Sequence, residues 1–258
     1  MRGASLSKNH EQWLRALHRK KHRREEKCFL AEGFNSLGAA LESHLYPLRE
    51  LIVDDGHKDA VMEVAPRGLP VLICSNKTLS RISTEETPQG VIAVCSERAF
   101  SLGEIEVSAP CTILYLDRIS DPGNLGTILR TAAWFGVRRV FLSSSCVDPF
   151  STKVIRSSAG MIFFVELYRS VSGDEVFRFA EEKKFRTIAA IPFGGDSLRR
   201  LGRASRNIIL LGHEREGLSE EIRTRADLAV SIPGAGTAES LNVAVAASLL
   251  LYEISGEI

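Results

Sequence analysis

Short apolar segments alternate with helical patterns from Cys111 to the end of the chain, and few folds accommodate this order. The apolar segments predict strands at 112–116, 139–143, 162–166, 187–191, 207–211 and 228–232, and residues 239–254 predict a last helix. Strands that alternate with helices form a parallel sheet covered on both faces, so the expected class is α/β. Ligands of such sheets bind in the loops beyond the carboxyl ends of the strands.

A smaller unit of the same kind precedes this alternation. Residues 48–53, 71–74 and 90–95 predict strands, and residues 32–43 and 57–65 predict helices. Residues 97–110 have no clear period and are typical of a connecting segment. The sequence therefore predicts an N-terminal arm at 1–27, a small α/β domain at 28–98, a linker at 99–110 and a larger domain at 111–258.

Composition excludes several classes of protein. Hydrophobic residues make up 44% and charged residues 25%, which is an ordinary globular mixture. The longest apolar run, 241–252, contains Asn242 and Ser248 and is shorter than the roughly 20 residues that a membrane helix needs. No signal peptide is visible, and five cysteines without a C-x-x-C pair favour reduced core thiols. We therefore expect a cytoplasmic protein without membrane association.

The first 27 residues are strongly basic, with nine Lys or Arg and three Glu, whereas the remainder of the chain is acidic. A run of this kind is either a solvated helix face, a flexible tail or an electrostatic arm for a phosphate backbone. A mitochondrial presequence is disfavoured because Glu residues interrupt the segment. If the segment is an RNA-binding arm, its contacts are Arg19, Lys20, Lys21, Arg23 and Arg24.

The loop after the strand at 112–116 carries the first group of candidate residues. The sequence Asp121-Pro122-Gly123-Asn124 predicts a turn that begins a helix, because proline is tolerated in a first helical turn. Arg130 follows Asn124 by nearly two helical turns, so the two side chains can face the same side. The alternative for Arg130 is an ordinary solvent-facing arginine.

The loop at 210–219, LLGHEREGLS, follows the strand at 207–211. Gly212 and Gly217 permit backbone shapes that other residues resist. Glu214 is therefore expected at the carboxyl end of the strand, inside the crevice, and the alternative is a solvated carboxylate in a turn. The neighbouring His213 has no predicted partner.

The loop at 232–243, IPGAGTAESLNV, begins like a dinucleotide-binding fingerprint, G-x-G-x-x-G. Position 239 is Glu instead of the third glycine, and the loop follows the last strand instead of the first. Both facts disfavour a nucleotide-dependent dehydrogenase. Ser240 is compatible with a helix N-cap, but Asn242 is a poor helix former within an apolar stretch and is a candidate functional residue.

Together the three loops resemble the three motifs of the SpoU (TrmH-type) RNA 2′-O-ribose methyltransferases, within the SPOUT superfamily. Asn124 and Arg130 match the first motif. The second motif, G-x-E-x-x-G-L, and the third, a proline loop that ends in S-L-N-V, match Gly212, Glu214, Gly217, Leu218, Pro233, Ser240, Leu241, Asn242 and Val243. The segments 153–160 and 29–33 also resemble the family, the latter at the start of its L30e-like substrate-binding domain.

The resemblance implies a parallel sheet with a deep trefoil knot near the C-terminus, preceded by the small L30e-like α/β domain. It implies S-adenosylmethionine as the cofactor, held by the second and third loops at Leu211, Gly212, Ile232 and Leu241. It also implies a homodimer whose site draws on both subunits, and a ribosomal or transfer RNA as the substrate.

By the same resemblance the catalytic residues are Asn124, Arg130, Glu214, Ser240 and Asn242. Arg130 orients the target phosphate, and this role is favoured over that of a base because a guanidinium stays protonated. The neutral side chains position ribose, Arg130 or cofactor, and Glu214 fixes their network. No metal is required, since a sulfonium methyl is already electrophilic. The alternative is a catalytically silent RNA-binding or ribosome-assembly protein on the same scaffold.

Overall fold

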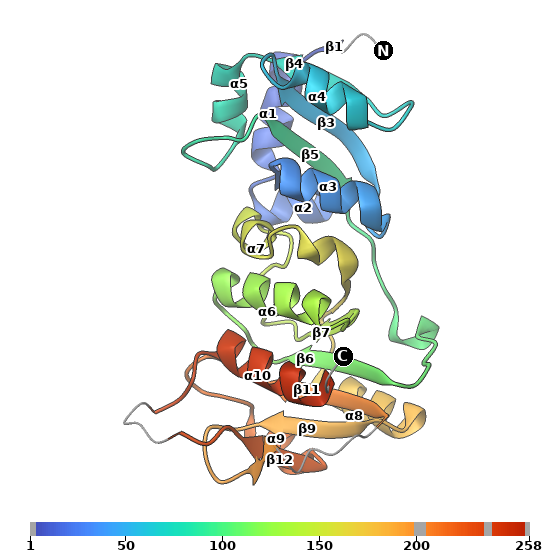
Figure 1. The fold of residues 1–258 in the computed structure, drawn as a ribbon, viewed down its shortest axis with the longest axis vertical. Coiled ribbons are helices and arrows are strands. Elements are labelled where there is room, and N and C mark those ends of the chain that lie inside the picture. The colour runs from blue at the N-terminus through green and yellow to red at the C-terminus, as the bar shows by residue number, and fades with distance from the viewer. Residues whose placement is uncertain (1–3, 199–204, 235–238, 256–258) are drawn as a thin grey trace. The chain divides into compact units, whose positions relative to one another are not determined.

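The structure of the protein, a computed structural model, describes residues 4–198, 205–234 and 239–255. It contains two compact units, and most of their helices and strands are labelled in Figure 1. The first comprises the residues up to Arg98 together with Asp148–Phe164, and the second comprises Ala99–Val147 and the residues from Val165 onward. The chain therefore passes from one unit to the other at three places, of which the end of Arg98 is the first.

The first unit is built on a five-stranded sheet of order β1-β4-β3-β5-β2, in which β5 runs antiparallel to β2 and β3. Its elements are β1 (Ala4–Ser5), α1 (Lys8–Ala16), α2 (Lys20–Glu26), β2 (Cys28–Glu32), α3 (Phe34–Ser43), β3 (Leu48–Asp54), α4 (Lys58–Val64), β4 (Val71–Cys74), α5 (Asn76–Ile82), β5 (Val91–Ser96), α7 (Thr152–Ser157) and the 3-10 helix η2 (Met161–Phe164). The three strands predicted in this region are present to within one residue at each end.

The N-terminal segment differs from the arm expected at 1–27, because residues 8–26 fold as α1 and α2. Ser7 caps α1, and Leu14 and Leu17 are buried among the apolar side chains of β2, β3 and β5. Two leucines three residues apart lie on one side of a helix, so this short segment has an apolar face to bury. The basic residues are thus carried by helices of the first unit.

Residues 148–164 complete the first unit through an aromatic cluster. The ring of Phe150 stacks on Phe29 with centroids 4.6 Å apart, and Tyr46 and Phe163 lie within 6.2 Å of each other and of Phe29. All four side chains are almost fully buried. Large buried aromatic rings contribute strongly to a core, so this segment is an integral part of the first unit.

The second unit contains a seven-stranded sheet of order β10-β12-β9-β11-β6-β7-β8, in which every pair is parallel, as the alternating pattern predicts. Its elements are η1 (Leu102–Glu104), β6 (Cys111–Leu116), α6 (Pro122–Trp134), β7 (Arg139–Leu142), β8 (Glu166–Arg169), α8 (Gly173–Lys183), β9 (Arg186–Ala190), β10 (Asp196–Ser197), β11 (Arg206–Leu211), α9 (Glu220–Arg225), β12 (Leu228–Ser231) and α10 (Val243–Ser255).

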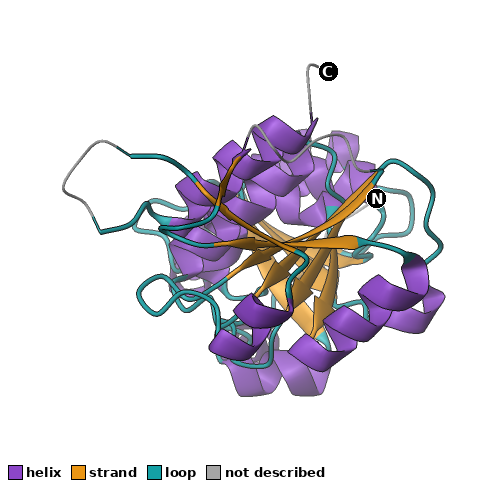
Figure 2. Cartoon of the chain, turned by 90° about the horizontal axis from the view of Figure 1, so that it is seen from below, coloured by secondary structure: helices purple, strands orange, loops and turns teal. Residues whose placement is uncertain are grey.

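Both faces of this sheet are covered. Consecutive residues of the central strands, such as Ile113 and Leu114, point to opposite faces and are all buried. Apolar side chains of α8 and α9 pack on one face, and α6 and α10 lie side by side elsewhere in the unit. Figure 2 shows the strands of the whole chain in orange among its helices.

One predicted strand is wrong. Residues 162–166 were expected to be extended, but Met161–Phe164 form a 3-10 helix and the strand begins at Glu166. The apolar run is buried in the first unit, where Phe163 belongs to the aromatic cluster. A short segment that is apolar throughout has no alternation of apolar and polar residues, so its sequence does not distinguish a strand from a helix. No helix within the described residues is long and apolar enough to cross a membrane.

Candidate active site

The first component of the site is the N-terminus of α6, which follows β6. Asp121 is the N-cap, and its carboxylate accepts a hydrogen bond of 2.8 Å from the backbone N–H of Asn124. Pro122 occupies the first helical turn, where its missing N–H costs nothing. The helix therefore begins where the sequence predicts, and it places Asn124 in its first turn.

The second component is the tight loop that follows β11. Gly212 packs so closely against this loop that an added Cβ would lie 2.1 Å from the backbone nitrogen of Leu218. His213 and Gly217 close the loop through a pair of backbone hydrogen bonds, with Gly217 at a φ of +71°. The two glycines thus serve the sharp reversal that the sequence predicts, and the reversal projects Glu214 toward α6.

Glu214 binds the N-terminus of α6. Its carboxylate accepts hydrogen bonds from the backbone N–H of Asp121 at 3.0 Å, from the hydroxyl of Ser120 at 3.0 Å and from the side-chain amide of Asn124 at 3.1 Å. Burial raises the pKa of this carboxyl, but the hydrogen bonds from Asp121, Asn124 and Ser120 outweigh it and lower the pKa to about 2. Glu214 is therefore ionised at neutral pH.

The third component is Asn242, at the start of α10. Its side-chain oxygen accepts the backbone N–H of Ala244 at 2.9 Å, as an N-cap does, which explains an asparagine beside an apolar helix. Its side-chain amide donates to the side-chain carbonyl oxygen of Asn124 at 2.9 Å. The three loops are thus connected by one chain of side-chain hydrogen bonds, Asn242 to Asn124 to Glu214.

A cavity of about 340 Å³ lies beside this chain, at the carboxyl ends of the adjacent strands β9, β11 and β12. All four residues predicted to hold the cofactor line it: Leu211, Gly212, Ile232 and Leu241. Glu214 and Ser240 line it as well, whereas Asn124 and Asn242 do not. Most of the remaining wall is apolar, so the cavity suits a ligand with a flat apolar part.

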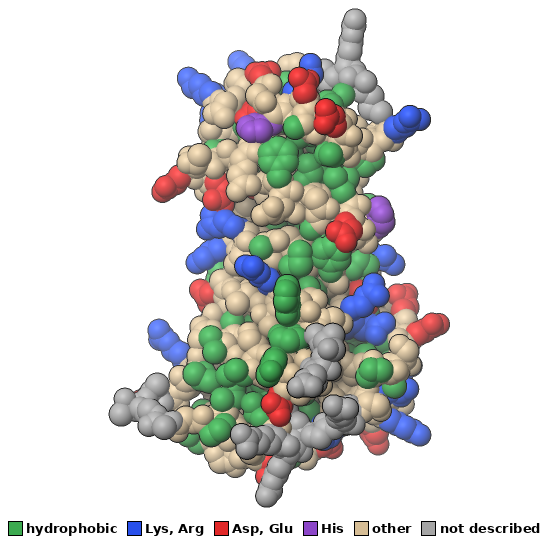
Figure 3. All heavy atoms as spheres, viewed as in Figure 1, with side chains coloured by type: hydrophobic (Ala, Val, Ile, Leu, Met, Phe, Trp, Pro, Cys, Tyr) green, Lys and Arg blue, Asp and Glu red, His purple; other side chains and the backbone are tan. Residues whose placement is uncertain are grey.

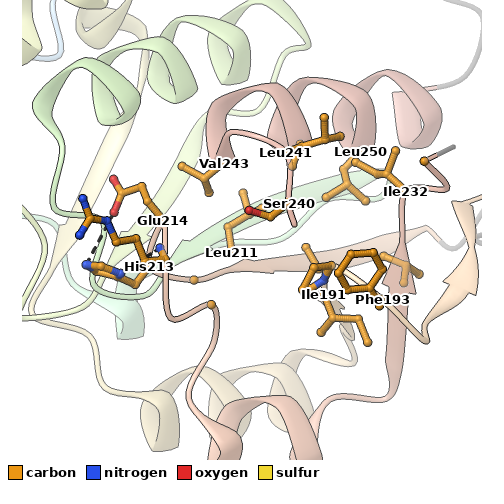
Figure 4. Close-up of a pocket in the computed structure, with 18 residues that line it drawn as sticks. Ile191, Phe193, Leu211, His213, Glu214, Ile232, Ser240, Leu241, Val243 and Leu250 are labelled. Carbon is orange, nitrogen blue, oxygen red and sulfur yellow. Dashed lines mark hydrogen bonds and ion pairs between the residues drawn. The ribbon is translucent and has the colours of Figure 1, made fainter. Parts of the chain in front are cut away.

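Sequence reasoning missed one wall of this cavity, the loop after β9. Ile191, Pro192 and Phe193 contribute to it, and Figure 4 shows Ile191 and Phe193 across the cavity from Leu241. The side chain of Phe193 is nevertheless 69% exposed. The glycine pair after Phe193 could have indicated that this loop packs closely against another strand. In the structure, Gly195 has no room for a Cβ beside β12.

Arg130 lies apart from the other candidate residues. It is exposed on α6 and does not line the cavity, and its guanidinium forms no hydrogen bond or ion pair with the other described residues. Four large hydrophobic side chains are exposed on α6 and α10: Trp134, Val245, Leu249 and Tyr252. Figure 3 shows hydrophobic side chains over these two helices. Arg130 therefore borders an apolar surface instead of the cavity of its own chain.

Four of the five basic residues predicted to bind RNA are exposed, namely Arg19, Lys20, Lys21 and Arg24. Arg23 is the exception, and its assignment is corrected. Its side chain is 6% exposed and binds the carboxylate of Asp148 at 2.6 Å and the carbonyl of Leu17 at 2.7 Å. One residue of the run turns inward because a helix must bury one side to pack, so Arg23 has a structural role.

Comparison with protein families adds an independent observation. The model of the SpoU rRNA Methylase family matches residues 112–252, more than half of the chain, and the model of the MRM3-like substrate binding domain matches residues 11–93. The second match includes most of α1 and all of α2, in agreement with their place in the first unit. The match to a methylase family also decides against the alternative function of a nucleotide-dependent dehydrogenase, which the glycines of the third loop had suggested.

Known relatives match over nearly the whole chain. The 23S rRNA (guanosine(2553)-2′-O)-methyltransferase RlmP of Bacillus subtilis is 31% identical over 93% of each chain. The 23S rRNA (uridine(2479)-2′-O)-methyltransferase of Streptomyces viridochromogenes is 29% identical and covers 94% of this chain and 88% of its own.

Solved structures agree with both. An AdoMet-bound rRNA methyltransferase from Sinorhizobium meliloti has a TM-score of 0.88 at 32% identity, over 97% of this chain and 95% of its own. The SpoU methyltransferase AviRb of Streptomyces viridochromogenes, in complex with AdoMet, has a TM-score of 0.86 at 28% identity over 97% of each chain. Three motif loops are joined by hydrogen bonds beside one cavity, and a family model spans all three. The chain therefore belongs to the SpoU rRNA methylase family.

Proposed function

We propose that this protein transfers the methyl group of S-adenosylmethionine to a ribose 2′-hydroxyl of ribosomal or transfer RNA. The observation that carries the proposal is the hydrogen-bonded chain of Asn242, Asn124 and Glu214 beside a cavity at the strand ends. Relatives that cover most of the chain are named as 23S rRNA 2′-O-methyltransferases, and two similar structures contain AdoMet.

The cavity fits this cofactor. Its volume lies within the usual range for small-molecule sites, and the apolar side chains of Leu211, Ile232 and Leu241 suit a purine ring. Gly212 presents backbone without a side chain, which leaves polar groups close to a ligand. The cofactor supplies an electrophilic methyl group. The protein must then align the ribose oxygen with this methyl group and accept the proton of the 2′-hydroxyl.

The neutral and ionised groups of the chain have separate tasks. A carboxylate with a pKa of about 2 is a weak base at neutral pH, so we assign Glu214 to orientation. It accepts from the amide of Asn124, whose carbonyl accepts from Asn242, so the orientation of Asn124 is fixed at both ends. Ser240 faces the same cavity, and we assign it to hydrogen bonding of ribose or cofactor.

Arg130 does not line the cavity of its own chain, but in a homodimer it could reach the cavity of the second copy. The side chains of Trp134, Tyr252, Val245 and Leu249 are 80%, 66%, 48% and 40% exposed on α6 and α10. An apolar surface of this kind is typical of a protein interface. We infer that a second copy covers it, and that Arg130 of one copy orients the target phosphate at the cavity of the other.

The remaining assignments concern both units. Arg19, Lys20, Lys21 and Arg24 bind the RNA backbone, and residues 28–98 form the core of the substrate-binding domain, which residues 148–164 complete. Residues 99–110 connect it to the methyltransferase domain, which the rest of 111–258 forms. We also propose the deep trefoil knot and a cytoplasmic location. The parallel order β9-β11-β6 favours the knot, whose third loop includes residues 235–238, outside the described residues.

Two measurements test the function. Isothermal titration calorimetry should detect binding of S-adenosylmethionine and S-adenosylhomocysteine but not of NAD. Mapping of 2′-O-methylation in RNA from cells with and without the gene should then reveal one or few sites that depend on it. RNA binding with no such site would favour the catalytically silent alternative, and binding of NAD alone would refute the proposal.

A further inference from the structure

Arg118 connects the end of β6 to the loop that follows β11. Its guanidinium donates to the carboxylate of Asp117 at 3.1 Å, to the carboxylate of Glu216 at 2.5 Å and to the backbone carbonyl of Gly217 at 3.0 Å. Asp117 is buried and its backbone N–H is bonded to β11, so this end of the bridge is fixed in the sheet. Gly217 lies in the loop whose backbone lines the cavity.

The backbone of Arg118 is itself held in an unfavourable shape. Its φ of +59° is in the left-handed region, which costs a residue with a side chain roughly 1 kcal/mol or more. Its backbone N–H donates to the hydroxyl of Ser143 at 2.9 Å, which holds this conformation. A glycine would adopt the same φ without strain, so local backbone geometry does not account for an arginine here. Its three side-chain contacts do.

At Gly217 the side chain of Arg118 meets the loop's own backbone hydrogen bonds. Its carbonyl accepts both the guanidinium of Arg118 and the backbone N–H of His213, at 3.0 and 3.1 Å. The other side of the loop is held by Glu214, which binds the N-terminus of α6. Both attachments start from the same segment, 117–124. The loop is therefore fixed on two sides before any ligand arrives, and such preorganisation lowers the cost of binding.

We propose that Arg118 is a positioning residue that holds the 212–218 loop in the shape that binds S-adenosylmethionine. It touches neither the cavity nor the reacting groups, so it acts through Gly217 and Glu216. The inference rests on the proposed function, because it concerns affinity for that cofactor. Arginine is required for it, since a lysine ammonium cannot reach three acceptors in a planar arrangement.

The test compares cofactor affinity with fold stability in three variants. In Arg118→Gly the backbone strain is relieved while the bridge is lost, and Arg118→Lys keeps only the charge. Arg225→Ala is the matched control, because Arg225 also binds two carboxylates, those of Asp174 and Glu221, but lies away from the cavity. The dissociation constant of S-adenosylmethionine is measured by calorimetry, and the unfolding temperature is measured without and with cofactor.

We expect about tenfold weaker binding in Arg118→Gly, which corresponds to about 1.4 kcal/mol, and nearly the same loss in Arg118→Lys. The unfolding temperature of Arg118→Gly without cofactor should fall, because the buried carboxylate of Asp117 loses its partner, whereas that of Arg118→Lys should stay within a few degrees of wild type. In both variants the increase on adding cofactor should shrink. Arg225→Ala should bind normally. Wild-type affinity in both Arg118 variants would overturn the inference alone, whereas no binding by the wild-type protein would overturn the proposed function.

If Arg118→Gly does not fold, Glu216→Gln decides the matter. Glu216 is 66% exposed, so its substitution leaves the core intact, yet it removes the charged partner of Arg118. A two- to fivefold weaker affinity, with kcat at saturating cofactor unchanged, is the expected result. Unchanged affinity in Glu216→Gln together with Arg118→Lys would overturn the inference.

Discussion

Asn242 donates its side-chain amide to the carbonyl oxygen of Asn124 at 2.9 Å, which joins two loops 118 residues apart in the chain. The other end of Asn124 is bound by Glu214, so the amide of Asn124 cannot rotate without the loss of one bond. Asn242 also caps α10 with its side-chain oxygen. Its two functions, capping and donation, can therefore be separated by substitution.

Asn242→Asp should retain the cap and lose the donor, whereas Asn242→Ala should lose both. We expect Asn242→Ala to cost about 1 kcal/mol of unfolding free energy and Asn242→Asp less, because aspartate caps helices as well as asparagine does. The methyl-transfer rate should nevertheless fall at least tenfold in both, because neither side chain donates a hydrogen bond to the side-chain carbonyl oxygen of Asn124. Single-turnover kinetics and urea unfolding measure the two effects. A normal rate in Asn242→Asp would assign Asn242 to capping only.

The low pKa of Glu214 makes the stability of the second unit depend on pH. The folded value, about 2, lies below the ordinary carboxyl value of 4.5, so the unfolded state binds more protons between them and stability falls as pH drops through this window. Glu214→Gln should lose about 3 kcal/mol at pH 7 relative to wild type, and the difference should shrink toward pH 2.

The measurement for Glu214 is denaturant unfolding at several pH values. Glu253→Gln is the control, because Glu253 is an exposed carboxylate on α10 outside the network. A difference between wild type and Glu214→Gln that is constant from pH 7 to pH 3 would show that the hydrogen bonds do not stabilise the ionised form.

Arg130→Ala should lower the methyl-transfer rate at least ~100-fold, the scale expected for the loss of a positioning group. Affinity for S-adenosylmethionine should stay within a few-fold, because Arg130 does not line the cavity. Arg130→Lys should fail nearly as badly, since an ammonium lacks the planar pair of donors for a phosphate. The matched control is Arg138→Ala, which removes an exposed arginine of the same unit. Near-normal rates in both variants would show that Arg130 is an ordinary solvent-facing arginine without a role in the reaction.

Charging the apolar surface of α6 and α10 should separate the proposed dimer. Leu249→Arg and Tyr252→Arg place a cation where a second copy is expected, so sedimentation should give 28.4 kDa particles. Val64→Arg is the control, because Val64 is 52% exposed in the first unit. A wild-type protein that is monomeric and active at micromolar concentration would exclude the dimer.

The basic residues of the first unit should divide into two groups. Substitution of Arg19, Lys20, Lys21 and Arg24 by Gln should flatten the salt dependence of RNA binding, because fewer counterions are released. Arg23→Ala should instead destabilise the fold by about 3–5 kcal/mol, since it leaves the carboxylate of Asp148 buried and unpaired. RNA binding titrations in increasing salt, together with thermal unfolding, distinguish the two. An unchanged salt slope in the fourfold variant would mean that these residues face solvent only.

Most of the strands and the three loops could be located from the sequence because each carries a local signal: a run of Val, Ile and Leu, a glycine, or a proline. The strand β2 was missed. The family resemblance, and not a local signal, implied Leu211, Gly212, Ile232 and Leu241 as the residues around the cofactor, and all four line one cavity in the structure. The pairing of Asn124 with Asn242 could not be predicted from either loop, because it depends on how α6 and α10 pack. The inward turn of Arg23 was missed for the same reason, since Asp148 lies 125 residues away.

The three passages between the units also set an order for folding during synthesis. The rings of Phe150 and Phe163 complete the core around Phe29 and Tyr46, and the ribosome adds them only after β6, α6 and β7 have been made. At 5–20 residues per second, roughly 3–13 seconds separate the synthesis of Arg98 from that of Phe164. A nascent chain that ends at Arg98 therefore exposes an incomplete aromatic core. The first unit must wait for a segment that follows β6, α6 and β7 in the sequence, and a gene fragment cut at this boundary would encode an unfinished domain.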